Sequence, residues 1–262
     1  MSNPIVQLND VCFFYGQEMI LKHLSLTVKK NSLCFIMGIN GSGKTTLLKN
    51  MMGFLLPRKG RIEINGTDVA TIDRYTMSRL VSYVPQVINL NTDFTVMDYL
   101  SLGRTPHLGL FAKMKETDFE IIDRYSARLG VKRFLGIPFN KLSSGQKQMV
   151  AVTRSLIQDT PLIILDEPMS ALDIGKQVDL LQVLRELISD GKTIILTTHN
   201  PNHALALKCD VCFLKQGTLI AYGDSIETIS EKILNEIYGN NISLDCGKKR
   251  RFVVFNTDSL KI

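Results

Sequence analysis

The order of apolar and polar positions predicts an alternation of strands and helices. Strict alternation or a short apolar run predicts strands at residues 5–14, 23–28, 33–37, 61–64, 81–84, 162–165, 193–197, 211–214 and 251–255, with a hairpin over 214–222. Helical spacing predicts helices at 46–52, 95–102, 115–129, 149–156, 174–188, 225–230 and 231–238. The strand signal fades from about 88 to 158, which indicates a helical insertion within an α/β chain.

Length and composition add bounds to this picture. The 262 residues are 45% hydrophobic and 21% charged, which leaves room for one large or two small domains with an ample core. Because no apolar run reaches the ~20 residues of a membrane helix and the N-terminus lacks a secretory pattern, we expect a cytosolic protein. The net charge of +6 permits contact with nucleic acid or an anionic membrane without demonstrating either, and we interpret the basic run 248–251 as a solvated tail.

The five cysteines do not point to a framework of disulfides. An odd number in a cytosolic chain is expected to stay reduced. Cys209 and Cys212 form a C-x-x-C pair, which can serve metal binding or redox chemistry. They have no second pair nearby and border a predicted strand, so we favour a structural role for them.

The stretch GINGSGKTT at residues 38–46 follows a predicted strand and opens a predicted helix. It fits G-x-x-x-x-G-K-[ST], in which glycines let backbone N–H groups approach phosphates closely. Lys44 would place its charge on the β/γ oxygens, and the hydroxyl of Thr45 could bind Mg²⁺. The dipole of the following helix adds positive charge at the same place. We therefore expect a nucleotide phosphate site whose close-approach glycines are Gly38, Gly41 and Gly43.

Two carboxylates follow the apolar run 162–165, where their burial would be costly without a function. With a phosphate loop upstream, Asp166 is expected to hold Mg²⁺ and Glu167 to polarise an attacking water. His199 follows the next predicted strand, and we favour a functional role for it because α/β proteins place ligand groups at such strand ends.

Three further positions remain open on pattern alone. Tyr15 could stack on a nucleotide base or pack in the core, and the pattern favours the core. Gln86 ends a short strand, where it could be a ligand group or an ordinary surface residue. Ser143 and Ser144 precede an amphipathic run, and a helix cap is favoured over an anion site.

Taken together, these motifs closely resemble the ATP-binding subunit of an ABC transporter, over nearly all of the chain. The matching segments in order are Tyr15 (aromatic loop), GINGSGKTT (Walker A), Gln86 (Q-loop), LSSGQ (signature), LIILDEP (Walker B with its glutamate), SALD (D-loop) and His199 (H-loop). Two departures are mild: Ile39 stands where the family often has Pro, and Ser144 replaces the first Gly of LSGGQ. Intact Glu167 and His199 imply competent hydrolysis.

The resemblance implies a fold, a set of ligands and partners. The fold is α/β: a P-loop NTPase with a RecA-like core, an antiparallel β subdomain and a helical signature subdomain. The implied parts of a single 1–262 domain are 1–87 (N-terminal β and phosphate-loop part), 88–158 (helical subdomain), 159–240 (remainder of the core) and 241–262 (C-terminal tail).

The family also implies a head-to-tail homodimer that encloses two ATP molecules with Mg²⁺. The signature of each chain would contact ATP bound to the other. The implied ATP contacts are Tyr15, Gly38, Asn40, Gly41, Ser42, Gly43, Lys44, Thr45, Thr46, Ser143, Ser144, Gly145, Gln146 and Asp173. The implied metal contacts are Thr45, Gln86 and Asp166, and the implied catalytic residues are Glu167, His199 and Gln86.

Segments 95–109 and 198–204 resemble the subfamily that serves iron-siderophore, haem, cobalamin and molybdate importers. This likeness implies a peripheral subunit at the cytoplasmic face of the cell membrane. Its partners would be integral permease subunits and, indirectly, an extracytoplasmic binding protein, with no nucleic acid. A soluble ABC ATPase of an assembly or repair system is the alternative, and segment 103–109 argues against it. A non-hydrolysing scaffold is opposed by Glu167 and His199.

Overall fold

The computed structural model describes residues 4–88, 93–109, 112–239, 242–247 and 251–255. The chain forms two compact units: the first comprises Met1–Ile72 with Ile195–Ile262, and the second comprises Asp73–Ile194. Strand β8 (Thr193–Thr198) is buried throughout and crosses this boundary in sequence. The subdomain limits expected from the sequence stay a prediction. None of the helices in these described ranges is long and apolar enough to cross a membrane.

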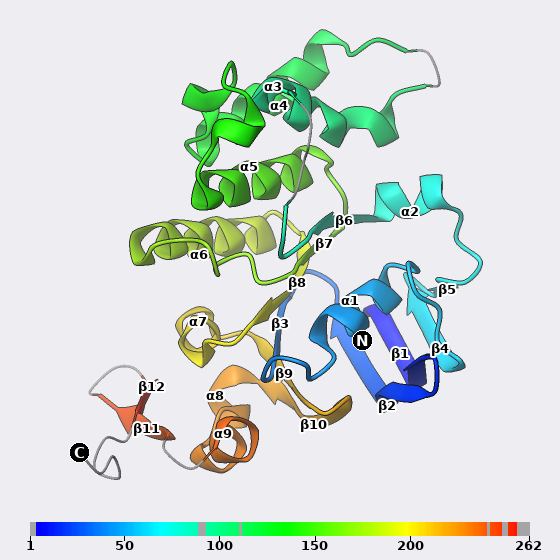
Figure 1. The fold of residues 1–262 in the computed structure, drawn as a ribbon, viewed down its shortest axis with the longest axis vertical. Helices are drawn as coiled ribbons and strands as arrows, with labels where there is room; N and C mark the ends of the chain where they lie inside the picture. The colour runs from blue at the N-terminus through cyan, green and yellow to red at the C-terminus, as the bar shows by residue number, and fades with distance from the viewer. Residues whose placement is uncertain (1–3, 89–92, 110–111, 240–241, 248–250, 256–262) are drawn as a thin grey trace. The chain divides into compact units, whose positions relative to one another are not determined.

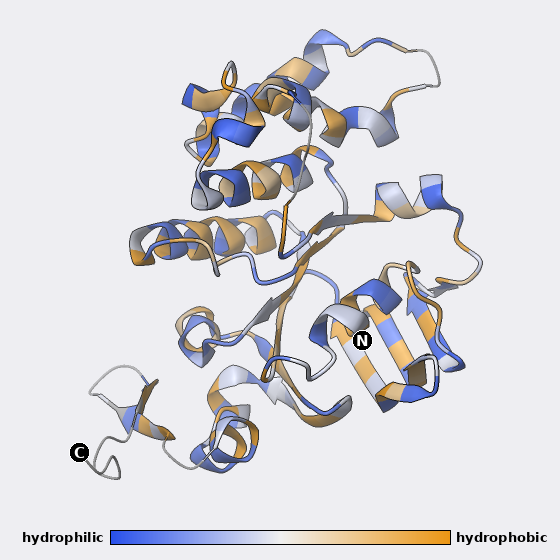
Figure 2. Cartoon of the chain, viewed as in Figure 1, coloured by the Kyte–Doolittle hydropathy of each residue, from blue (hydrophilic) through white to orange (hydrophobic). Residues whose placement is uncertain are grey.

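An antiparallel sheet forms one part of the first unit, with the strand order β2-β1-β4-β5 (Figure 1). Its strands alternate apolar and polar residues, which Figure 2 shows as orange and blue steps along β1 and β2. Asn65 and Gly66 both have positive φ, as the tight turn between β4 and β5 requires. The strand bounds are β1 Pro4–Tyr15, β2 Glu18–Lys29, β4 Lys59–Ile64 and β5 Thr67–Asp68. β2 thus begins five residues before the predicted 23–28, since it pairs with β1 from the turn onward.

The other part of the first unit carries the phosphate loop. Strand β3 (Leu33–Met37) is buried at all five positions, as a strand covered on both faces must be. It pairs in parallel with β9 (Asp210–Lys215), which pairs antiparallel with β10 (Thr218–Asp224). Helix α1 (Lys44–Met51) follows β3 after the loop, so strand, loop and helix occur in the predicted order.

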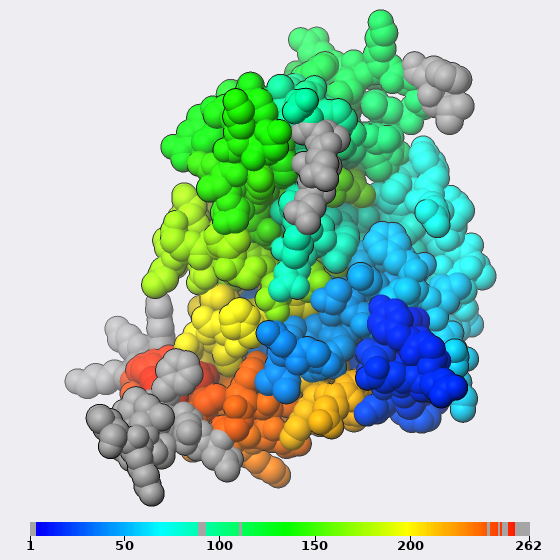
Figure 3. Space-filling model, viewed as in Figure 1, coloured from blue at the N-terminus to red at the C-terminus, as the bar shows by residue number. Residues whose placement is uncertain are grey.

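Three short helices and a hairpin end the first unit. They are α7 (Pro201–Leu207), α8 (Ser225–Thr228), α9 (Glu231–Tyr238), β11 (Ile242–Cys246) and β12 (Arg251–Phe255). β11 and β12 pair antiparallel; β11 packs on α9 and β12 on α7. Figure 3 shows the red atoms of the hairpin against the orange atoms of the segment before it. The apolar pattern predicted α8, α9 and β12 but missed α7 and β11.

The second unit begins with α2 (Arg74–Leu80) and the parallel strands β6 (Val81–Val84) and β7 (Leu162–Leu165). The elements in the described residues between these strands are all helices, of which α5 (Ser144–Ile157) packs against α3 and α4. The other bounds are α3 Val96–Ser101, η1 Leu102–His107, α4 Glu116–Arg128, η2 Lys132–Phe134, η3 Phe139–Lys141 and α6 Ile174–Ser189. A buried ion pair joins Arg104 in η1 to Asp118 in α4, with Nε and Oδ1 2.8 Å apart.

Candidate functional site

The phosphate loop needs glycine for steric reasons that the structure makes explicit. A Cβ added to Gly38 would collide with the backbone oxygen of Leu214 and lie 2.7 Å from Oγ of Ser42. Gly43 is the residue before α1 and has a φ of 102°, which side chains rarely allow. No side chain caps α1 at this residue, so its first backbone N–H groups face the loop, as an anion site requires.

Lys44 and Ser42 place polar groups inside this loop. The ammonium of Lys44 is buried and donates to the carbonyl oxygens of Gly38 (2.9 Å) and Ile39 (3.1 Å). The hydroxyl of Ser42 is buried, and within the described part of the chain it has no hydrogen-bond partner. A buried polar atom without a partner is costly, and a phosphate oxygen would satisfy it. The loop therefore fits the polyphosphate that its sequence predicts.

Tyr15 ends β1 and is 48% exposed. The ring meets Phe13 edge-on, with the ring centres 4.9 Å apart. The core role that the pattern favoured for Tyr15 is therefore wrong, because an aromatic strand end can turn outward while the preceding strand residues fill the core. The exposed ring is free to stack on a flat ligand.

The two carboxylates of the second unit sit at the end of β7. The backbone N–H of Asp166 donates to the carbonyl of Val84 at 2.9 Å, which continues the pairing of β7 with β6. Both carboxylates are buried. Glu167 has a φ of +47°, a left-handed conformation that costs a non-glycine residue ~1–3 kcal/mol and that is common at functional sites. Burial, and secondly the charge of Asp166, raises the pKa of Tyr83 to about 12.

Gln86 and Glu167 meet although 81 residues separate them. The amide Nε2 of Gln86 donates to Oε2 of Glu167 at 3.3 Å. β6 and β7 run in parallel and end side by side, which brings these two side chains to the same sheet edge. The arrangement gives the carboxylate a neutral donor that can orient it without removing its negative charge.

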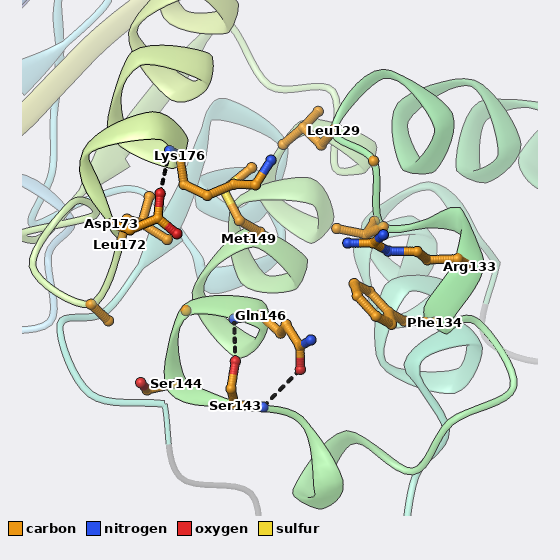
Figure 4. Close-up of a pocket in the computed structure, with 14 residues that line it drawn as sticks. Leu129, Arg133, Phe134, Ser143, Ser144, Gln146, Met149, Leu172, Asp173 and Lys176 are labelled. Carbon is orange, nitrogen blue, oxygen red and sulfur yellow. Dashed lines mark hydrogen bonds between the residues drawn. The ribbon is translucent and has the colours of Figure 1, made fainter.

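The signature residues line a cavity of about 410 Å³ within the second unit. Figure 4 shows the reciprocal cap at the start of α5: the backbone N–H of Gln146 donates to Oγ of Ser143 (3.3 Å), and that of Ser143 donates to Oε1 of Gln146 (2.9 Å). The favoured cap is thus confirmed for Ser143, while Ser144 is already the first residue of the helix.

The opposite wall of this cavity comes from the start of α6. Asp173 accepts from the backbone N–H of Lys176 at 2.9 Å and so begins that helix. Lys176 and Arg133 bring two cations to the lining, although no sequence motif includes them. Local sequence patterns could not select these two residues, because the lining residues lie between 129 and 176 and come together only in the folded unit.

His199 follows β8 in the first unit, and its side chain is exposed. The neighbouring His203 is buried, and burial, with a smaller effect from His199, lowers the pKa of His203 to about 4. Periodicity did not select His203, since a histidine within a short helix carries no pattern of its own.

The remaining predicted residues fall into the two units. Tyr15, the 38–46 loop with Asn40, Gly41, Thr45 and Thr46, and His199 belong to the first unit. Gln86, Asp166, Glu167, the signature with Gly145, and Asp173 belong to the second. The structure brings together Gln86 with Glu167, and Ser143–Gln146 with Asp173. Joint action of the two units on one ligand stays a proposal.

The cysteine pair is shielded from solvent: Cys212 is buried and Cys209 is half-buried. Burial raises the pKa of Cys212 to about 12 and also raises that of Cys209, so both thiols are protonated at neutral pH. A protonated, buried thiol is a poor nucleophile and a poor metal ligand.

Comparison with known proteins identifies the family. A family described as "ABC transporter" matches residues 21–170. A Helicobacter pylori protein named "Probable iron chelatin transport ATP-binding protein" is 34% identical over 90% of this chain and 97% of its own. The Bacillus subtilis iron(3+)-hydroxamate import ATP-binding protein FhuC is 31% identical over 86% of this chain and 84% of its own.

Comparison with solved structures gives the same family. A metal-chelate type ABC transporter in an inward-facing conformation has a chain with a TM-score of 0.82 and 26% identity, covering 97% of both chains. The dimeric bacterial cassette MJ0796 gives a TM-score of 0.77 and 28% identity, over 84% of this chain and 98% of its own. These matches confirm the predicted fold class. The chain therefore belongs to the ABC transporter family, as an ATP-binding subunit that hydrolyses ATP.

Proposed function

We propose that this ATPase powers import of a metal chelate, with ferric siderophores as the favoured cargo over haem, cobalamin and molybdate. The observation that carries the proposal is that relatives matched over most of this chain are named for such cargo. The Bacillus subtilis relatives are named for iron(3+)-hydroxamate and for petrobactin import, and a Halobacterium salinarum relative is named for cobalamin import. Segments 95–109 and 198–204 support the same subfamily.

ATP is proposed to bind between an aromatic ring and the phosphate loop. The exposed ring of Tyr15 would stack on the adenine, while backbone N–H groups of residues 38–46 would surround the phosphates. Lys44 would exchange its carbonyl contacts for phosphate oxygens, which are stronger acceptors for an ammonium. Ser42 would gain the partner that its buried hydroxyl lacks among the described residues.

Mg²⁺ is proposed to be held by the hydroxyl of Thr45, the side-chain oxygen of Gln86 and the carboxylate of Asp166. These donors fit the ion, since Mg²⁺ prefers oxygen ligands and usually takes one or two carboxylates plus phosphate. The ion supplies charge that neutralises the phosphate oxygens during transfer. The amide of Gln86 presents its nitrogen to Glu167, which leaves its oxygen for another partner.

Glu167 is proposed as the group that orients and polarises the attacking water. Its carboxylate accepts a hydrogen bond from Gln86, and its left-handed backbone fixes the direction in which the side chain leaves the strand end. His199 is proposed to assist at the γ-phosphate, where an imidazole can donate a hydrogen bond to an anionic oxygen. No covalent intermediate is needed for this transfer.

The chain is proposed to act as a homodimer on the cytoplasmic face of the membrane. The cavity that contains Ser143, Gly145 and Gln146 would receive ATP bound to the partner chain. Arg133 gives the lining positive charge that suits an anion, whereas the ammonium of Lys176 is paired with Asp179 at 2.7 Å. Asp173, at the rim of the same cavity, would contact that partner. Permease subunits and an external binding protein complete the proposed importer.

Exchange of Glu167 for Gln tests both parts of the proposal. We expect ATP turnover by Glu167→Gln to fall about 10²- to 10⁴-fold with ATP still bound, whereas the exposed control Glu120→Gln keeps wild-type turnover. Glu167→Gln with ATP then serves as bait in detergent-solubilised native membranes. Co-purification of a polytopic membrane protein is the expected result, and its cognate binding protein is tested against ferric siderophores, haem, cobalamin and molybdate. Capture of a ribosome or a soluble assembly would overturn the transport role.

A further inference from the structure

The C-terminal hairpin (β11 and β12) is hydrogen-bonded to the rest of the first unit on both of its outer edges. Both attachments are made at one rung, that is, at one pair of facing residues. Leu244 of β11 stands opposite Val253 of β12. The N–H of Leu244 donates outward to Oε1 of Glu231 in α9 at 2.9 Å. On the other edge, the N–H of Val253 donates to Oδ1 of Asn202 (2.7 Å), and its carbonyl accepts from Nδ2 of Asn202 (3.2 Å). Leu244 and Val253 are therefore a pair whose backbone groups point away from each other.

The side chain of Asn202 thus imitates a neighbouring strand. A strand offers one acceptor and one donor to each outward-facing residue, and the carboxamide of Asn202 supplies both to Val253. A carboxylate or an aliphatic group could not make this pair of bonds. The match between one amide side chain and one backbone rung indicates a specific attachment, unlike loose packing of a tail.

Asn202 is also part of a chain of hydrogen bonds around His199. The backbone N–H of Asn202 donates to Oδ1 of Asn200 at 3.0 Å, and the N–H of Asn200 donates to Oγ1 of Thr198 at 3.1 Å. His203 closes the loop, because its Nε2 accepts from Nδ2 of Asn200 (3.4 Å) and its Nδ1 bonds Oγ1 of Thr198 (3.3 Å). Thr198, on one side of His199, is therefore hydrogen-bonded to Asn200 and His203, on its other side.

Helix α7 cannot hold this arrangement by itself. It has seven residues, and a helix of that length is unstable without tertiary contacts. Asn202 is its second residue and lies three positions after His199. The position of this helix start therefore depends on contacts from outside the helix, and the rung at Val253 provides two of them.

We propose that the C-terminal hairpin positions His199 through Asn202. This inference rests on the catalytic role proposed above for His199. Asn202 is a positioning residue: β12 fixes its amide, the amide fixes the start of α7, and the start of α7 fixes the loop of His199. Loss of the attachment should let that loop sample other positions, and misplacement by about 1 Å can reduce a rate substantially.

The test compares Asn202→Ala with a matched control. Asp73→Ala also removes two hydrogen bonds, from the N–H (3.0 Å) and hydroxyl (2.6 Å) of Thr76, but at the start of α2 in the second unit. Asn202→Asp is a second variant of native size that keeps the acceptor and loses the donor, which protects the test if the alanine variant folds poorly. All variants are made in the full chain.

The first readout is the imidazole NMR spectrum, which is tractable because the chain has four histidines. The His199 signal is assigned by its absence in His199→Ala. We expect Asn202→Ala and Asn202→Asp to shift or broaden the His199 signal, while Asp73→Ala leaves it in place. An unchanged His199 signal in both Asn202 variants would overturn the proposal, whatever the ATPase activity is.

The second readout is steady-state ATP hydrolysis. We expect kcat of Asn202→Ala to fall about five- to tenfold with KM for ATP unchanged, a smaller effect than loss of the His199 ring itself. Equal kcat for Asn202→Ala and wild type, alongside a large loss in His199→Ala, refutes the positioning role alone. Full activity of His199→Ala refutes the proposed function of His199 instead, so the two failures are distinguishable.

Discussion

The buried ion pair between Arg104 and Asp118 allows a quantitative prediction for the helical part of the second unit. The two side chains are 10% and 7% exposed, and Nε of Arg104 donates to Oδ1 of Asp118 at 2.8 Å. Arg104 also donates from Nη1 to the carbonyl of Ile157 at 3.0 Å, at the end of α5. Oδ2 of Asp118 accepts from the N–H of Lys115 at 2.9 Å. The pair therefore joins η1, α4 and α5.

Arg104→Met keeps most of the side-chain volume and removes the charge. It leaves a buried carboxylate at Asp118 and a carbonyl at Ile157 without their cation. Loss of one partner of a buried pair costs about 3–5 kcal/mol. For a chain of this size, each kcal/mol lowers Tm by about 2–4 °C, so we expect a fall of about 6–20 °C.

The double variant Arg104→Met/Asp118→Leu separates this cause from a general loss of packing. Removing both charges leaves no buried ion. The remaining losses are the bond from the Lys115 N–H and the bond to the Ile157 carbonyl, each worth ~1 kcal/mol. We therefore expect the double variant to be more stable than Arg104→Met, within about 1–2 kcal/mol of wild type. The control pair Lys132 and Asp123 is more than half exposed, and Lys132→Met should change stability by under about 1 kcal/mol.

Thermal unfolding followed by circular dichroism measures these differences. A bond from the Lys115 N–H, and with it Arg104, holds the pKa of Asp118 below its usual range. The stabilisation from Asp118 is therefore present above the ordinary pKa of aspartate and is lost as the pH falls through the lower, folded value. The difference in stability between wild type and Arg104→Met should therefore become smaller at acid pH. A double variant less stable than Arg104→Met, or a gap independent of pH, would refute the electrostatic account.

Two further predictions concern the nucleotide. Lys44→Ala should raise the Kd for ATP about 10- to 100-fold in a fluorescent-nucleotide assay, because a hydrogen bond from a charged donor is worth ~1.5–3 kcal/mol, and unchanged affinity would exclude contact with phosphate. Gly145→Ala should abolish ATP turnover yet keep ATP binding, because the new Cβ would lie 2.9 Å from the carbonyl oxygen of Ala171. Gly136→Ala, whose new Cβ would meet no atom within 4 Å, is the control and should keep wild-type turnover.

Periodicity and motif spacing predicted the elements and motifs whose structure is determined by neighbouring residues in the sequence. β3 was predictable because a strand buried on both faces reads as one apolar run, and α4 because its apolar face repeats over 13 residues. The phosphate loop was predictable because all of its functional groups come from nine consecutive residues, 38–46. The cap at Ser143 was predictable for the same reason, since a serine followed three residues later by Gln146 forms a capping box.

Features that depend on distant residues were not predictable in this way. The contact of Gln86 with Glu167 requires two strands to pair in parallel, and the left-handed backbone of Glu167 leaves no trace in residue type. β11 was missed because a five-residue strand is weak until β12 pairs with it. Helix α7 did have a local signal, Asn200 as cap and Pro201 in the first turn, but it is too short for a period to appear.

The signature motif shows how the structure explains a departure from a family pattern. Ser144 occupies the first turn of α5 with its side chain exposed, so this position makes no demand for glycine. Gly145 has ordinary helical φ, yet the carbonyl of Ala171 approaches so closely that no Cβ fits. Position 145 therefore requires glycine because the neighbouring backbone leaves no room for a Cβ, and not because its φ excludes other residues. The approach also fixes the start of α5 against the segment that leads to Asp173, so a bulkier residue here would disturb both walls of the cavity at once.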